Sequence, residues 1–163
     1  MAKIKKLVEL AGMITLYPDR HNQSTWFSGV HSTTKLSTLR PENNGCGTTL
    51  CAAGWTAALY APKKSVFVPT EEEYFFVPAE NGEYQIDGDD YEETFYVNTA
   101  GKHYDMVYIP SFASEELDLT PDQATSLFYN SSSSEDVLNV IRAIIANPKI
   151  SGDELDILIS HDD

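Results

Sequence analysis

The sequence predicts an α+β protein, in which helices from both ends of the chain pack together around a small antiparallel β-sheet insertion. Helical periodicity and helix start signals mark the two ends, whereas the middle carries short β-prone runs separated by turn residues. With 163 residues, 42% of them hydrophobic, the chain is long enough for one packed core. We therefore expect a single domain over 1–163, with a helical scaffold at 1–61 and 111–163 and an acidic β insertion at 63–110.

The N-terminal segment predicts an amphipathic helix over 4–17. Its apolar residues follow the i, i+3, i+4, i+7 spacing of one helix face, namely Ile4, Leu7, Val8, Ala11 and Ile14. Pro18 disfavours helical geometry at Tyr17 and ends the helix. The apolar residues form neither a signal-peptide core nor a bilayer-spanning run, so we expect a cytoplasmic protein without membrane contact.

A loop and a second helix follow. Residues 19–47 are rich in Ser, Thr, Asn and Gly, which predicts a loop that Trp26 anchors to the core. Thr48 or Thr49 is the predicted N-cap of a helix that ends near Tyr60.

The insertion is predicted to form three to five antiparallel strands, because Asn81-Gly82 and Asp87-Gly88 separate β-prone runs. Three helix start signals come after it. They pair an N-cap with a residue three positions later: Thr120 with Gln123, Ser133 with Asp136, and Ser151 with Glu154.

The two cysteines of the chain, Cys46 and Cys51, lie at the start of the second helix and allow several interpretations. A helix N-terminus favours a thiolate, so either cysteine is a candidate nucleophile of a hydrolase or transferase. His103 is then the candidate base and Gln23 the candidate oxyanion donor. A disulfide would be transient in a reducing cytoplasm. The cysteine spacing is unlike that of zinc sites, and we expect neither a metal nor another cofactor.

A structural role is the remaining interpretation of this stretch. Small residues recur at helical spacing, which would let a second helix approach closely; they are Cys51, Ala53, Gly54, Ala57 and Ala58. On this interpretation the structural residues are Trp26, Cys46, Cys51, Gly54 and Trp55.

Charge is unevenly distributed along the chain, whose formal net charge is −14. Residues 1–66 carry a balance of +5 and residues 67–163 a balance of −19. Between Glu71 and Glu93 there are ten carboxylates and no basic residue. Such a surface repels nucleic-acid phosphate and attracts basic proteins. The predicted partner-binding residues are Glu71, Glu72, Glu73, Asp87, Asp89, Asp90, Glu92 and Glu93. The alternative is a solvated hairpin whose charged edges resist aggregation.

Three motifs occur in a recognisable order: QSTW at 23–26, CGTTLCAAGW at 46–55 and LDLTPDQATSLF at 117–128. Together they resemble a family of small uncharacterised proteins of actinobacteria and their bacteriophages. The resemblance covers roughly 1–61 and 111–147. It implies a phage or actinobacterial origin, with a host-cell cytoplasmic location if the protein is phage-encoded, and places the cysteine helix in a shared scaffold. It carries no established activity.

These observations favour a non-enzymatic phage-type binding protein whose acidic surface engages a basic host protein, as an inhibitor or a nucleic-acid mimic. A cysteine-dependent enzyme using Cys51 or Cys46 with His103 is one alternative. A structural or virion-associated protein is the other.

Overall fold

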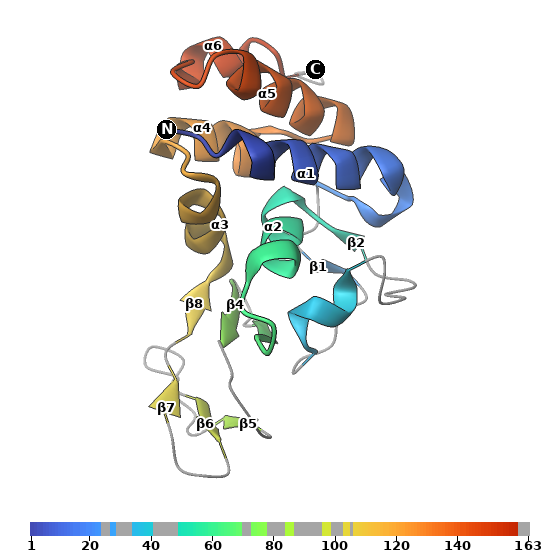
Figure 1. The fold of residues 1–163 in the computed structure, drawn as a ribbon, viewed down its shortest axis with the longest axis vertical. Helices are drawn as coiled ribbons and strands as arrows, with labels where there is room; N and C mark the ends of the chain where they lie inside the picture. The colour runs from blue at the N-terminus through green and yellow to red at the C-terminus, as the bar shows by residue number, and fades with distance from the viewer. Residues whose placement is uncertain are drawn as a thin grey trace.

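A computed structural model provides the fold, and it describes residues 1–23, 27–28, 34–40, 49–69, 73–77, 84–86, 96–98, 103–104 and 106–159. The fold is α+β, as predicted: helices from both ends of the chain gather at one end of the molecule, and short antiparallel strands extend away from them (Figure 1).

The helical scaffold joins the first and last parts of the chain. Helix α1 packs against α5, and α2 packs against α3 (Figure 1). The chain start is tied to the end of α3, because the Lys3 amide donates to the Leu117 carbonyl at 2.9 Å. The α-helices are α1 (Ile4–Leu16), α2 (Ala52–Tyr60), α3 (Ile109–Leu117), α4 (Pro121–Thr125), α5 (Ser134–Ala146) and α6 (Gly152–Asp156).

Helix α1 ends at Leu16 before Pro18, as predicted, but its buried face differs from the predicted one. Val8 was expected in the core and is 52% exposed, whereas Leu10 and Met13 are buried. The buried stripe is therefore rotated around the helix, toward the side that faces α5 and α3.

Helix α2 begins later than predicted. Cys51, not Thr48 or Thr49, is its N-cap, because Thr49 and Leu50 form strand β2 (Thr49–Leu50). Strand β2 pairs antiparallel with β1 (Phe27–Ser28), which holds the chain extended up to the cap. All residues from Ala52 to Ala58 are buried, so this short helix is surrounded by the rest of the scaffold.

The three predicted start signals are confirmed. Thr120 and Ser151 each form a complete capping box, with Gln123 and Glu154, and Ser133 accepts a hydrogen bond from the Asp136 amide. Helix α4 continues directly into a π-helical segment, η4 (Ser126–Asn130).

The β insertion contains two three-stranded antiparallel sheets in the described residues, where one small sheet was predicted. The inner sheet has the order β3 (Val66–Pro69), β4 (Tyr74–Val77), β8 (Val107–Tyr108). It joins the scaffold, because Phe67 and Phe76 belong to the same hydrophobic core as α1, α2, α3 and α5.

The outer sheet has the order β5 (Tyr84–Ile86), β6 (Tyr96–Asn98), β7 (His103–Tyr104). It lies at the end of the molecule farthest from α5 and α6 (Figure 1).

Candidate functional site

The three sequence motifs meet at the side chain of Gln23. Its Oε1 accepts a hydrogen bond from the Ala52 amide at 3.1 Å, at the N-terminus of α2. Its Nε2 donates to the Leu127 and Phe128 carbonyls of η4, at 3.1 and 3.2 Å. Only an amide side chain supplies a carbonyl acceptor and two N–H donors together. Gln23 therefore links the first motif to the second and the third.

His21 extends this network to α5. Its Nε2 lies 3.1 Å from Gln23 Oε1, and its Nδ1 lies 2.6 Å from Ser134 Oγ. Because Gln23 Nε2 donates to two carbonyls, Gln23 Oε1 must be the acceptor, which assigns the imidazole hydrogen to His21 Nε2. His21 Nδ1 then accepts from the Ser134 hydroxyl. The imidazole is 7% exposed, and burial lowers its pKa, so it is neutral at pH 7.

The sequence did not single out His21 and Ser134 as partners. They lie 113 positions apart, and each is a common polar residue without a distinctive local motif. In enzymes with a serine nucleophile, the serine hydroxyl donates a hydrogen bond to a neutral imidazole that acts as its base. The contact between Ser134 and His21 has this arrangement. In this structure the same contact also anchors the segment after α1 to the start of α5.

Cys51 lies at the N-cap of α2, where its Sγ accepts from the Gly54 amide at 3.5 Å. The thiol is free and 2% exposed, and burial raises its pKa to about 11. It is therefore protonated at neutral pH, which opposes the nucleophile interpretation of Cys51. Cys46 lies outside the described residues.

His103, the candidate base for a cysteine nucleophile, belongs to strand β7. Figure 1 places β7 at the outer end of the insertion, whereas Cys51 precedes α2 in the scaffold. The fold thus separates the elements that carry the two residues.

Trp55 and Gly54 lie inside the scaffold. The indole Nε1 of Trp55 donates to the Arg20 carbonyl at 2.8 Å, and the Arg20 guanidinium lies 5.0 Å from the centre of its ring system. Arg20 also donates to the Leu39 carbonyl at 2.6 Å. Gly54 is buried on the same helix, and Trp26 lies outside the described residues.

The acidic candidate residues fall mostly outside the described part of the chain. Glu73 is described and exposed, directly before β4. The other seven are Glu71, Glu72, Asp87, Asp89, Asp90, Glu92 and Glu93, which lie outside the described residues.

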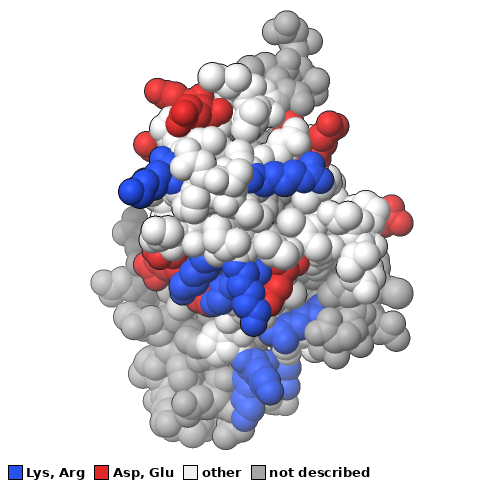
Figure 2. Space-filling model, turned by 45° about the horizontal axis from the view of Figure 1, so that its top comes forward, with Lys and Arg blue, Asp and Glu red and all other residues white. Residues whose placement is uncertain are grey.

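The described residues themselves are nearly balanced in charge, with ten Lys/Arg and twelve Asp/Glu. Figure 2 shows side chains of both signs interspersed over one face. The remainder of the sequence carries one Lys/Arg and thirteen Asp/Glu, so it holds most of the net charge of −14.

An aromatic groove of about 310 Å³ lies between α3 and the α4–η4 segment. The hydroxyl oxygens of Tyr108 and Tyr129 are 3.3 Å apart, and Tyr129 is 55% exposed. Glu115 is the one charged side chain among the described residues that line the groove. The lining residues are Tyr108, Pro110, Ser111, Ser114, Glu115, Pro121, Ala124, Thr125, Phe128 and Tyr129.

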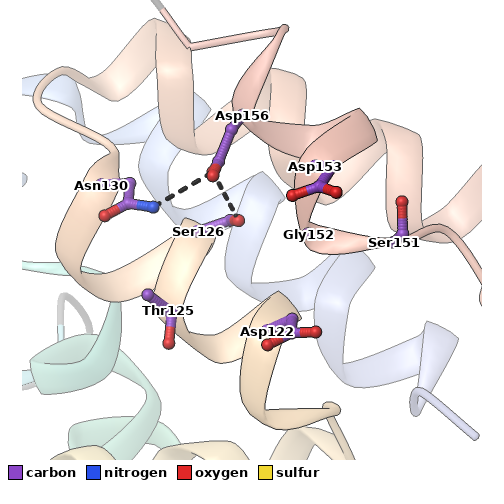
Figure 3. Close-up of a pocket in the computed structure, with 8 residues that line it drawn as sticks. All are labelled: Asp122, Thr125, Ser126, Asn130, Ser151, Gly152, Asp153 and Asp156. Carbon is purple, nitrogen blue, oxygen red and sulfur yellow. Dashed lines mark hydrogen bonds between the residues drawn. The ribbon is translucent and has the colours of Figure 1, made fainter.

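A smaller polar groove of about 190 Å³ lies between α6 and the α4–η4 segment (Figure 3). Asp156 Oδ1 accepts from Ser126 Oγ at 2.8 Å and from Asn130 Nδ2 at 3.1 Å, which ties α6 to η4 (Figure 3). Asp122 and Asp153 also line it. No group of three or more His, Cys, Asp or Glu among the described residues is arranged to hold a metal ion.

Comparison with known proteins finds no matching family model, no matching curated protein and no matching solved structure. Within the described part of the chain, every helix is too short or too polar to cross a bilayer.

Proposed function

We propose that this protein is a phage-type binding protein without catalytic activity, whose acidic insertion engages a basic host protein. The charge distribution carries this proposal. Ten carboxylates and no basic residue fall between Glu71 and Glu93, whereas the described residues as a whole are close to neutral. The negative electrostatic field of one such acidic segment attracts a basic protein surface and orients it.

The described scaffold supports a role in holding the acidic insertion in a fixed position. The motif residues Gln23 and Trp55 hold scaffold elements together through hydrogen bonds, whereas Cys51 caps the start of α2. The inner sheet shares the scaffold core through Phe67 and Phe76, so it fixes the base of the insertion. A surface used against nucleic-acid-binding proteins would compete with nucleic acid for their basic groups. Inhibition or nucleic-acid mimicry is the resulting mode of action.

Two variants of equal charge test this function. The insertion variant neutralises Asp89, Asp90, Glu92 and Glu93 to Asn or Gln. The scaffold variant makes the same change at four exposed carboxylates, namely Asp19, Asp122, Glu135 and Asp153. Each is used as bait in host lysate beside the wild-type protein.

We expect the insertion variant to lose the partner that the wild-type protein captures, and the scaffold variant to keep it. Both variants should stay folded, because exposed single charges contribute little to stability. Equal capture by all three proteins would show that the acidic insertion is a solubility device. A structural or virion-associated role would then be the better account.

Two covalent probes test the enzymatic alternative. An alkylating reagent at pH 7 should react with Cys51 in the native Cys46→Ser protein much more slowly than after unfolding, because the thiol is buried and protonated. A fluorophosphonate should leave Ser134 unlabelled if its contact with His21 only holds the scaffold together. Rapid reaction at either residue, lost in Cys51→Ser or Ser134→Ala, would favour an enzyme.

A further inference from the structure

We propose that the aromatic groove between α3 and η4 binds an arginine or lysine side chain of the basic partner, through the rings of Tyr108 and Tyr129 and the carboxylate of Glu115. This inference rests on the proposed function and adds a contact on the described scaffold. A cation within about 6 Å of an aromatic ring face is attracted by the ring quadrupole, and a nearby carboxylate adds to the attraction.

The groove has the composition that such a side chain requires. Its apolar walls, which include Pro110, Ala124 and Phe128, suit the aliphatic stem of Arg or Lys. Glu115 lies in it, and no Lys or Arg is among the described lining residues. Its volume of about 310 Å³ lies at the small end of the range for ligand sites.

The electrostatics of Tyr108 point the same way. Its pKa is raised by burial, then by the hydrogen bond to Tyr129 and by the carboxylate of Glu73. Tyr108 therefore stays a neutral phenol, and of these causes only the carboxylate of Glu73 would also attract a cation. Glu73 directly precedes β4 and Glu115 belongs to α3, so two separate parts of the chain place carboxylates around this tyrosine.

Tyr129 owes its position to the motif network. It belongs to the five-residue π-helical segment η4, closed by the Ser131 amide donating to the Ser126 carbonyl at 3.1 Å. Gln23 holds the neighbouring Leu127 and Phe128 carbonyls from the inside. π-Helical segments are rare and are frequent at functional sites. Here the segment faces the buried network on one side and carries the exposed Tyr129 on the other.

The groove lies where the insertion rejoins the scaffold. Tyr108 is the last residue of β8 and the N-cap of α3. The groove therefore adjoins the inner sheet, in which β8 pairs with β4 at the base of the insertion.

A short peptide tests the groove directly. The probe is the acetylated and amidated peptide (Arg-Gly)4, titrated into the full chain while NMR follows the ring signals of the tyrosines. The variants are Tyr129→Leu, which removes the aromatic face, and Tyr129→Phe, which keeps it. Tyr17→Leu is the matched control, because Tyr17 is 44% exposed at the end of α1. The neutral peptide (Gln-Gly)4 controls for non-ionic binding.

We expect the arginine peptide to shift the Tyr108 and Tyr129 signals and the neutral peptide to leave them unchanged. Tyr129→Leu should weaken binding about two- to fivefold, a typical exposed cation–π contribution. Tyr129→Phe and Tyr17→Leu should bind like the wild type. If Tyr129→Leu fails to fold, Glu115→Gln provides the second variant, with about a twofold loss expected from the removed charge.

Absence of these shifts, equal binding by Tyr129→Leu, an equal loss in Tyr17→Leu, or binding of the neutral peptide would each overturn the inference. The insertion variant separates this failure from that of the proposed function. If neutralising Asp89, Asp90, Glu92 and Glu93 weakens peptide binding but Tyr129→Leu does not, the acidic insertion binds cations and the groove does not. If Tyr129→Leu weakens peptide binding but the insertion variant does not, the groove binds the peptide and the acidic insertion does not.

Discussion

At the scale of single residues, Gln23 connects more of the fold than any other described polar side chain in the motifs. Its amide satisfies one N–H at the start of α2 and two carbonyls of η4, and it orients His21. A buried backbone group that loses its partner costs far more than an average hydrogen bond contributes. The three motifs, which are far apart along the chain, thus meet in the fold.

Gln23→Met should lower the free energy of unfolding by about 1–3 kcal/mol, because it leaves the Ala52 amide and two carbonyls without this partner. Urea unfolding at pH 7 measures the change. Thr15→Met at an exposed position of α1 is the control and should stay within about 0.5 kcal/mol of wild type. Equal stability of Gln23→Met and wild type would mean that water replaces the amide.

His21 should make stability depend on pH. Burial lowers its pKa from 6.5, so the unfolded chain binds a proton more readily than the folded chain. The contribution of neutral His21 to the free energy of unfolding is fully present above about pH 6.5. It is lost as pH falls toward the lowered pKa, at up to about 1.4 kcal/mol per pH unit. Urea unfolding between pH 7 and pH 5 should show a steeper loss for wild type than for His21→Asn. Parallel curves would contradict the assignment of a neutral, buried imidazole.

At the scale of elements, the helix caps were predicted correctly, whereas features that depend on contacts between distant segments were not. The caps at Thr120, Ser133 and Ser151 were correct because a cap needs only residues three positions apart. The start of α2 was wrong because Thr49 pairs with a distant strand. The exposure of Val8 was missed because the buried face depends on which neighbours α1 meets.

Two glycines at helical positions should respond oppositely to alanine. A Cβ at Gly12 of α1 would meet nothing within 4 Å, so Gly12→Ala should stabilise by about 0.5–1 kcal/mol through helix propensity. A Cβ at Gly152 would lie 2.9 Å from Asp122 Cβ, so Gly152→Ala should destabilise by about 1–3 kcal/mol. Thermal unfolding measures both. A stabilised Gly152→Ala would show that α6 moves away from α4 at little cost.

At the scale of the whole molecule, the candidate site was only partly predictable. The α+β architecture and the uneven charge followed from composition and patterning. The groove between Tyr108 and Tyr129 did not, because these residues lie 21 positions apart and meet only when α3 folds beside η4. The contact between His21 and Ser134 joins residues 113 positions apart and forms only when the segment after α1 meets the start of α5.

The central claim is that the acidic insertion binds a basic partner through its summed charge, and the salt dependence of affinity tests it most directly. The affinity for the captured partner is measured for the wild type, for the insertion variant and for the scaffold variant between 0.01 and 0.15 M salt. Over this range the Debye length falls from about 30 Å to about 8 Å. We predict that wild-type binding weakens by at least about tenfold, that the scaffold variant follows it, and that the insertion variant binds weakly with little salt dependence. Wild-type affinity that is independent of salt, or an insertion variant that matches it at every salt concentration, would contradict the account.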